Sequence, residues 1–462
     1  MTFEVRRADP SLPAVAGLAL ASGSRAASTE MSVQPSTPGG GSAWKEDAVQ
    51  APIHADGQQV FVGIDWGGSH HQLCVVDAAG ARRRQVRLTH DVAGLAQLDK
   101  ELGGLGARLA VAVERAEGLL VEHLQARGHL VYPVSPPIAA RARERYRAAS
   151  SKDDVFDAFV LADTLRHEHA RWRPLPLASP ALAELRALTR DRDRLLATQQ
   201  RTEAQLRAIL EAYHPAAARL FSSIDRQITL AFIGDYPTPQ AAAAVGEQRM
   251  ARFLARNRYT GRVAPQVLVE RLRANLLAGA PGTVTGKAHS ALVFAELLGL
   301  LNQQLADYDE AISLAVGRHP DAAIFVSFPG VGPVGTAALL AEIGEDRSHY
   351  PTVEVLLAEA GLAPVTRASG RSCRVRFRYA ANRNLRDACT WWAYNSLKES
   401  TWASEVYQQA RARGQHPYRA LRGLGARWMR VLWRCWTDRV PYDSAKHLKP
   451  TAQPAAQEGA SA

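Results

Sequence analysis

The sequence predicts an α/β domain with a mixed sheet, followed by a mostly helical half. From residue 60 to residue 134, short apolar runs alternate with amphipathic stretches, as in a sheet with helices on its faces. Beyond residue 180, long stretches carry leucine at steps of three and four residues, which is the period of a helix. A chain of 462 residues is also long enough for two or three domains.

Five apolar runs in the first half are predicted to be strands, and four stretches are predicted to be helices. The first three strands follow one another directly, and the last three are separated by helices, so a meander leads into β-α-β units. The expected strands are Val60–Ile64, Leu73–Val76, Val86–Leu88, Leu109–Val113 and Leu130–Val134, and the expected helices are Val92–Leu102, Gly118–Ala126, Ile138–Ala149 and Asp153–His167.

Two long helices are expected in the second half, at Pro180–Tyr213 and about Ala288–Val316. They predict a helical hairpin or coiled coil, which would serve self-association or pack on the sheet domain. From Ala323 to Val440 the pattern is again helical, with a loop at Gly361–Ser372. Six tryptophans at helical spacing in this part are expected in the core rather than on a surface that stacks bases.

These patterns divide the chain into five parts. Residues 1–57 are expected to be a disordered extension, unless the true start is Met31, and residues 443–462 a disordered tail. Between them we expect a metal-binding sheet domain at 58–170, a helical or coiled-coil spacer at 171–320 and a C-terminal domain at 321–442.

The charge balance favours a polyanionic partner. The formal net charge is +11, and of the 56 basic residues 49 are arginines. The planar arginine side chain matches phosphate oxygens two at a time, although a GC-rich genome would also replace lysine with arginine. The positions of the arginines along the chain must therefore decide between phosphate binding and codon composition as the reason for their number.

The four cysteines, at 74, 373, 389 and 435, are scattered without the spacing of a zinc site or a disulfide framework. A reduced, cytoplasmic protein is expected. The apolar runs are shorter than the roughly 20 residues needed to cross a bilayer, so no membrane segment is expected.

Four acids lie where predicted elements end or begin. Asp65 ends the first strand in FVGIDWGGSHHQLCVVD, Glu114 ends the fourth in LAVAVERAEG, and Asp154 and Asp157 share one helix face in SKDDVFDAFVLAD. Singly, each acid could be a turn residue, a solvated strand end or a helix start. Together they would repel one another unless a cation lay between them. Mg²⁺ prefers carboxylate oxygens as ligands, and two such ions about 3.5 to 4 Å apart can catalyse phosphoryl transfer. His70 and His71, beside Asp65, are expected to be solvated strand residues.

In order and spacing, these acids resemble the RuvC-type RNase H fold at the front of the DEDD transposases of the insertion-sequence 110 family. The resemblance implies that Asp65, Glu114, Asp154 and Asp157 are catalytic ligands of Mg²⁺ or Mn²⁺. Asp153 is an alternative to Asp154 as a ligand, and Asp163 lies close to the family's ligand pattern without matching it. The competing actin-like ATPase and sugar-kinase fold also begins with a G-I-D-x-G-x-S hairpin, but its second glycine-rich phosphate loop is not found in the sequence.

Two stretches of the C-terminal half indicate nucleic-acid binding. The motif P-G-V-G-P, with Gly330 and Gly332, precedes the expected helix Thr336–Ile343 and is similar to a helix-hairpin-helix element, whose amides bind a DNA phosphate; a turn between packed helices is the alternative. Further on, residues 371–386 contain no acid, and Phe377 and Tyr379 lie between their arginines, which favours a surface that follows a DNA or RNA backbone. These arginines are Arg371, Arg374, Arg376, Arg378, Arg383 and Arg386.

The order G-L-A-P, S-G, basic stretch and N-R-x-L-R resembles the C-terminal domain of the same family. The resemblance implies that Ser369 is the nucleophile, and Ser372 is the alternative from the residues alone. The chain departs from the family pattern at Tyr379-Ala380-Ala381, where a glycine-rich run is usual. The resemblance covers about Val60 to Val440.

The expected function is therefore that of a transposase or recombinase that cuts and rejoins DNA by a Mg²⁺-dependent attack of serine on the phosphodiester. The resemblance further implies a homo-oligomer, a dimer or tetramer, guided by a structured RNA from the element. Two alternatives remain: a junction-resolving nuclease of the same fold that acts by hydrolysis, and a non-catalytic nucleic-acid binder.

Overall fold

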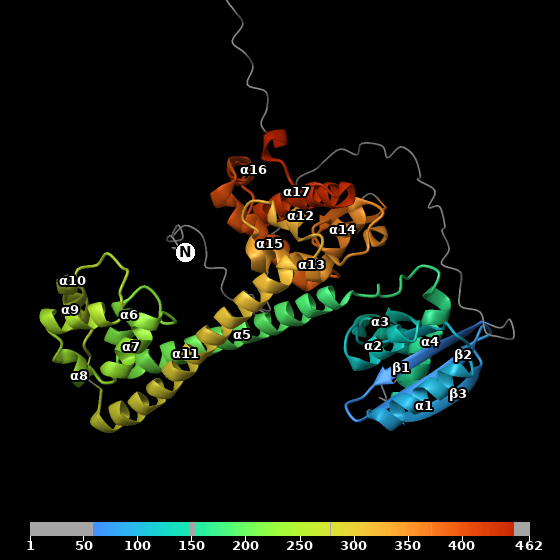
Figure 1. The fold of residues 1–462 in the computed structure, drawn as a ribbon, viewed down its shortest axis with the longest axis horizontal. Coiled ribbons are helices and arrows are strands. Elements are labelled where there is room, and N and C mark those ends of the chain that lie inside the picture. The colour runs from blue at the N-terminus through green and yellow to red at the C-terminus, as the bar shows by residue number, and fades with distance from the viewer. Residues whose placement is uncertain (1–58, 147–152, 278, 371, 448–462) are drawn as a thin grey trace, which may run out of the picture. The chain divides into compact units, whose positions relative to one another are not determined.

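The computed structural model describes residues 59–146, 153–277, 279–370 and 372–447, which form two compact units. We name residues 59–177 the sheet unit and residues 178–447 the helical unit; Figure 1 shows the elements of each. The expected spacer and C-terminal domain thus belong to one unit, and the division falls at 177/178 rather than 170/171. The expected N-terminal extension and most of the expected tail lie outside the described residues.

The sheet unit contains a five-stranded mixed sheet of order β3-β2-β1-β4-β5. Strands β1, β2 and β3 are antiparallel to one another, whereas β1 and β4, and β4 and β5, pair in parallel. This confirms the expected mixed sheet with flanking helices. The elements are β1 (Val60–Trp66), β2 (His70–Asp77), β3 (Arg82–Thr89), α1 (Val92–Gly103), β4 (Ala110–Val113), α2 (Leu119–Ala126), β5 (Leu130–Pro133), α3 (Pro136–Glu144) and α4 (Asp154–Glu168).

Helices cover both faces of this sheet. Helices α1 and α2 pack on the face that presents Val62 and Ile64, while α3 and α4 pack on the face that presents Phe61 and Ala112. The central strands β1 and β4 are therefore apolar on both sides, as expected for strands covered by helices. At Gly63 an added Cβ would lie 2.2 Å from the carbonyl oxygen of Ala158, so α4 approaches the backbone of β1 closely.

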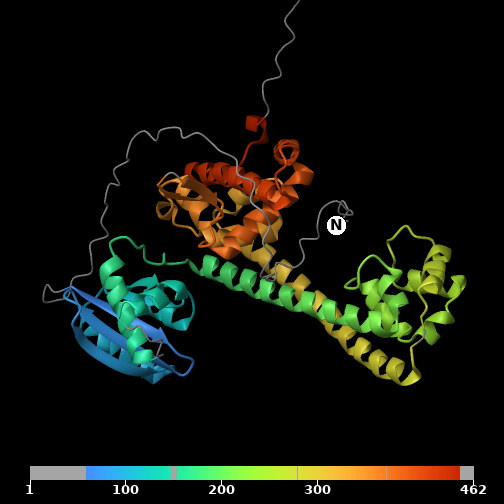
Figure 2. The same cartoon turned by 180° about the vertical axis from the view of Figure 1, so that it is seen from behind.

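The helical unit is built on two long antiparallel helices, α5 (Pro180–Tyr213) and α11 (Pro281–Gly317), which run side by side in Figures 1 and 2. Side-chain pairs along their length fix the alignment: Glu184 with Arg318, Arg192 with Asp309, and Gln199 with Asn302. This confirms the expected helical hairpin, and α11 begins seven residues earlier than predicted. By length and hydropathy α11 could also span a membrane, which is weak evidence because the core helix of a soluble protein passes the same test.

Each end of the helical hairpin carries a separate hydrophobic core, one among α6–α10 and one among α12–α17. The second core holds Trp392, Trp428 and Trp436, each at most 2% exposed, whereas Trp391 is 48% exposed. The expectation of buried tryptophans is thus confirmed for these three, while Trp402 and Trp433 are partly buried against the same core and Trp391 is exposed. The remaining helices are α6 (Pro215–Leu220), α7 (Gln227–Asp235), α8 (Pro239–Ala243), α9 (Glu247–Arg256), α10 (Pro265–Ala274), α12 (Ala322–Val326), α13 (Gly332–Ile343), η1 (Arg347–His349), α14 (Val353–Glu359), α15 (Arg383–Glu399), α16 (Thr401–Ala412), α17 (Pro417–Asp438) and η2 (Ser444–His447).

The expected loop at Gly361–Ser372 is partly a β-hairpin. Strands β6 (Val365–Ser369) and β7 (Ser372–Arg376) pair antiparallel, and the last residues of the pairing are Ser369 and Ser372. The loop prediction was wrong here because all of β7 and most of β6 are exposed, so the strands lack the apolar alternation by which strands are recognised.

Candidate active site

Asp65 lies in a row of polar side chains on the α4 face of the sheet. It pairs with Gln72 of β2, which pairs with Arg87 of β3, and residues opposite one another across a sheet share a face. Glu114 follows directly on Val113, whose partner in β1 is Ile64, so it continues the row on the other side. One face of the sheet thus presents two acids, an amide and a guanidinium in sequence.

Helix α4 supplies the other two acids. Asp153 is its N-cap, and its carboxylate accepts a hydrogen bond from the amide of Val155. Asp154 is exposed, whereas Asp157, one turn later, is only 2% exposed. Asp163 is also buried, and its carboxylate accepts hydrogen bonds from Tyr146 and Arg166. Partial burial of the Tyr146 hydroxyl, together with its hydrogen bond to Asp163, raises the pKa of Tyr146 to about 12. The structure therefore gives Asp153 and Asp163 structural contacts.

Arg143 of α3 joins two of the predicted ligands. Its Nε donates to Asp157 at 2.5 Å and its terminal nitrogen donates to Glu114 at 3.1 Å. Partial burial disfavours its charge, but the hydrogen bond to Asp157 and the charges of Asp157, Glu114 and Asp65 outweigh burial and raise the pKa of Arg143. The guanidinium thus offsets the negative charge of Glu114 and Asp157.

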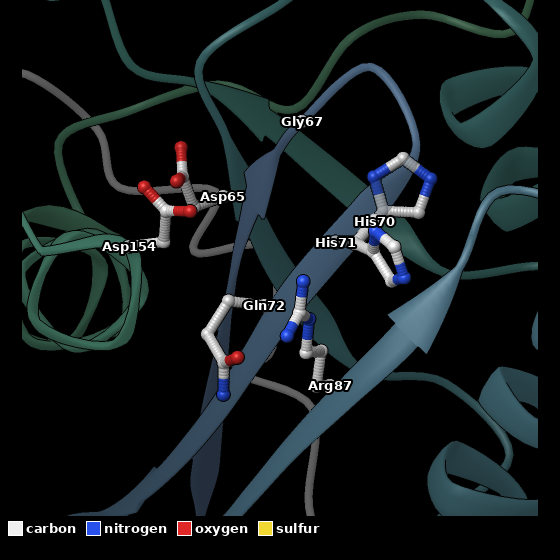
Figure 3. Close-up of a pocket in the computed structure, with 7 residues that line it drawn as sticks. All are labelled: Asp65, Gly67, His70, His71, Gln72, Arg87 and Asp154. Carbon is white, nitrogen blue, oxygen red and sulfur yellow. The ribbon is translucent and has the colours of Figure 1, made fainter.

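Asp65 and Asp154 line one small polar pocket together with Gln72 and Arg87, and Figure 3 shows these side chains around it. The four predicted ligands are therefore brought to one region as two pairs, Asp65 with Asp154 and Glu114 with Asp157. Within the described residues, no three His, Cys, Asp or Glu side chains are grouped so as to hold a metal ion. The donor set itself, carboxylates alone, suits Mg²⁺ or Mn²⁺.

His71 lines the same pocket and is only 2% exposed, so the expectation of a solvated residue was wrong for it. Its Nε2 lies 2.8 Å from Nδ1 of His90, and the Trp66 ring contacts both imidazoles. Burial, followed by the nearby His90 and His70, lowers the pKa of His71. The two contacting histidines therefore close the end of the β1–β2 hairpin. The tight turn of this hairpin leaves no room for a Cβ at Gly67, which would lie 2.4 Å from the carbonyl oxygen of His70.

Replacing Arg143 with alanine is expected to lower the free energy of unfolding of the sheet unit by about 2 to 3 kcal/mol, because the buried carboxylate of Asp157 loses its charged partner. Thermal unfolding of the full chain measures this. Arg141→Ala is the matched control, since Arg141 is exposed on the same helix. Equal losses in the two variants would contradict a structural role for the contact with Asp157.

Ser369 lies at the tip of the β6–β7 hairpin and is exposed. Gly370 follows with φ +55°, a left-handed conformation that glycine adopts without strain, and Ser372 stands opposite Ser369. The serine therefore projects on a narrow ribbon in the helical unit, while all four acids belong to the sheet unit.

The predicted arginines that the structure describes lie on β7, just after it, or at the start of α15. Arg374 and Arg376 are exposed on β7, Arg383 begins α15, and Arg371 lies outside the described residues. Arg378 donates to the carbonyl of Ala363, and Arg386 donates to that of Arg378, so these two also stabilise the hairpin base.

In the N-R-x-L-R motif, Asn382 caps α15 through its side chain and donates to Glu342. Glu342 is largely buried; although burial opposes its charge, Arg190 and Asn382 hold its pKa below the usual value. The first residue of the motif therefore fixes the start of α15.

The P-G-V-G-P motif leads into α13, as predicted, but α13 begins at Gly332, within the motif, rather than at Thr336. Gly330 has φ +75° and packs so closely on α15 that an added Cβ would lie 2.5 Å from the amide nitrogen of Ser396. Its own amide donates to Glu399 at 2.7 Å. Gly332 is exposed, with φ +62°. The turn thus packs two helices, and phosphate binding by its amides stays a prediction.

Comparison with known proteins identifies the family. A model of transposases, of the DEDD type of IS110, matches residues 62–215, and a model of the transposase IS116/IS110/IS902 family matches residues 322–408. A protein of Streptomyces coelicolor assigned as the mini-circle transposase for IS117 is 34% identical over 414 residues, 87% of this chain and 99% of that protein. The chain belongs to the IS116/IS110/IS902 transposase family.

Other relatives agree over the same extent. The 44.8 kDa protein of insertion element IS116 from Streptomyces clavuligerus is 30% identical over 85% of this chain and 98% of its own length. The 42 kDa protein of IS900 from Mycobacterium paratuberculosis is 29% identical over 84% and 98%. The first matched segment contains the four predicted metal ligands, and the second contains Ser369. As a transposase, the protein is a DNA-processing enzyme.

Sequence reasoning missed Arg143, Gln72, Arg87 and the His71–His90 pair. Cross-strand pairing could have signalled Gln72 and Arg87, had the register of β2 and β3 been known. Nothing in the sequence around Arg143 indicates its role. The chain contains 49 arginines, and the helix that carries Arg143 has no distinctive pattern.

Proposed function

We propose that this transposase cuts and rejoins DNA at a metal site formed by Asp65, Glu114, Asp154 and Asp157 of an RNase H-like, RuvC-type sheet unit, with Ser369 as the nucleophile. The observation that carries the proposal is the convergence of the four acids at the ends of β1 and β4 and the start of α4, with Arg143 between two of them. Such a concentration of carboxylates costs folding free energy, which favours a functional reason for it.

The side chains around the acids have separate roles. Bound Mg²⁺ would stabilise the charge that develops on the phosphate oxygens. Asp65 and Asp154 would hold it in the pocket that they line with Arg87 and Gln72, and these two side chains would bind the oxygens of the incoming phosphate. Arg143 keeps the Glu114 and Asp157 carboxylates oriented.

Ser369 carries out the exchange. Its Oγ forms a bond to phosphorus as the bond from phosphorus to a deoxyribose oxygen breaks, and the hydroxyl proton passes to solvent or to the leaving oxygen. The phosphoserine ester conserves the bond energy, so a deoxyribose hydroxyl of the second DNA strand attacks it and releases the serine. No external energy source is needed.

Ser369 belongs to the helical unit and the four acids belong to the sheet unit. We include in the proposal that Ser369 of one copy acts with the acids of another copy in a dimer or tetramer, and that a structured RNA of the element guides the complex. The exposed arginines of β7 support contact with a nucleic-acid backbone.

Asp65→Ala tests the metal site. In a recombination assay with two plasmids that carry the element ends, the variant is expected to lose Mg²⁺-dependent cleavage by at least about a thousandfold, while it retains DNA binding. Gly68→Ala, in the turn that follows Asp65, is the control for folding, since an added Cβ there meets nothing within 4 Å. Normal recombination by Asp65→Ala would overturn the proposal, and cleavage that releases only hydrolysed ends would favour a RuvC-type junction nuclease instead.

A further inference from the structure

Helix α17 carries a face of arginines that neither the proposed metal site nor the β6–β7 hairpin includes. Its apolar side, with Leu424, Trp428 and Leu432, is buried in the core. Arg419, Arg427 and Arg430 are exposed on the opposite side, within about 80° of one another around the helix axis. No acid occurs from Pro417 to Thr437.

The three arginines have no counter-ion in the part of the chain that the structure describes. Among the described residues, no ion pair involves Arg419, Arg427 or Arg430, whereas Arg434, one turn further on, pairs with Asp438 at 2.6 Å. Arg422 stands beside them, and burial, then the charges of Arg386 and Arg419, lower its pKa. Uncompensated like charges at close quarters destabilise a fold, so the cluster calls for an external anion.

The face is joined to the serine hairpin through Phe377. The guanidinium carbons of Arg386 and Arg422 lie 4.7 Å and 4.8 Å from the centre of its ring. Phe377 directly follows β7, and β7 pairs with the strand that ends in Ser369. Two cation–π contacts thus link the base of the hairpin to α15 and α17.

We propose that the α17 arginine face, made of Arg419, Arg422, Arg427 and Arg430, binds the phosphate backbone of duplex DNA beside the bond that Ser369 attacks. This rests on the proposed function, because Ser369 defines that bond. DNA is favoured over RNA because the α17 arginine face is attached, through Phe377, to the same hairpin that carries Ser369. The five residues of β7 span about 17 Å, or about five base pairs, so one duplex reaches both.

The test is the salt dependence of binding, measured by fluorescence anisotropy without divalent metal. The probes are a labelled duplex DNA and a labelled RNA hairpin, both of arbitrary sequence. Combined replacement of Arg419, Arg427 and Arg430 with glutamine is expected to reduce the slope of log Kd against log salt for DNA by about 2 to 3, since each phosphate contact contributes about 0.9. Arg427→Gln alone is expected to reduce it by about 1.

Arg434→Gln is the matched control, because it removes the same charge from the same helix at a position already neutralised by Asp438; its slope is expected to equal that of the wild type. A wild-type slope in the triple variant would overturn the proposal, and so would a reduction confined to the RNA probe. Glutamine preserves helix propensity, and circular dichroism checks folding. Because binding is measured without metal or strand cleavage, its outcome is independent of the Asp65→Ala and Ser369→Ala results that decide the proposed function.

Discussion

Ser369→Ala is expected to abolish the covalent protein–DNA adduct and to lower recombination by at least about a thousandfold, because in the proposed function Ser369 supplies the hydroxyl that attacks phosphorus. The loss arises from chemistry alone. Ser369 is exposed at a hairpin tip, so its removal disturbs no core contact, and DNA binding is expected to remain. Denaturing gel electrophoresis of labelled DNA, after quenching the reaction, detects the adduct directly.

Ser372→Ala provides the matched control. The two serines face one another at the end of the same ribbon and are both exposed, so the substitution makes an equal change in the same local environment. The adduct is expected to form at the wild-type level. Loss of the adduct in Ser372→Ala, with retention in Ser369→Ala, would assign the nucleophile to Ser372.

Gly63→Ala is expected to destabilise the sheet unit by about 3 kcal/mol or more. The added methyl would lie 2.2 Å from the carbonyl oxygen of Ala158 and 2.4 Å from the amide nitrogen of Ala162, both in the backbone of α4. Backbone atoms cannot turn aside as a side chain does, so α4 must move away from β1. Asp154 and Asp157 would move with it, and DNA cleavage is expected to fall as well.

Hydrogen–deuterium exchange measured by mass spectrometry separates this effect from general unfolding. Peptides of β1 and α4 are expected to exchange faster in Gly63→Ala, while peptides of α5 and α11 serve as an internal reference in the other unit. Gly68→Ala is the matched control, since an added Cβ there meets nothing within 4 Å. Protection of β1 at the wild-type level in Gly63→Ala would show that the two elements are less tightly packed than the structure indicates.

The parts of the fold that could be predicted are those with a strong local period. Strands β1 and β4 are continuous apolar runs, and α5 repeats leucine along one face, so their type followed from the residues alone. The place of Asp65 at the end of the first strand could also be predicted from the residues alone, because it follows an apolar run and comes shortly before two glycines. Its convergence with Asp154 depended on the resemblance to a family, since sequence order does not show which edges of a sheet meet a helix end.

The features that escaped prediction depend on long-range contacts or on polar elements. Arg143 reaches Asp157 and Glu114 across two other elements, and nothing near it in the sequence indicates these partners. His71 looked solvated because its neighbours are polar, yet it is buried against His90 and Trp66. The α17 face was overlooked because arginines are frequent throughout this chain, and only burial shows which of them share one side.

The antiparallel pairing of α5 and α11 also limits how the protein can change in length. Contacts along the pair join residues of α5 to residues of α11, as Arg192 to Asp309 and Gln199 to Asn302. A deletion of seven residues would shorten one helix by about 10 Å, and only an equal deletion in the other would restore the alignment beyond it. The lengths of the two helices are therefore coupled, and the distance between the two cores of the helical unit can change in evolution only when both helices change by the same number of residues.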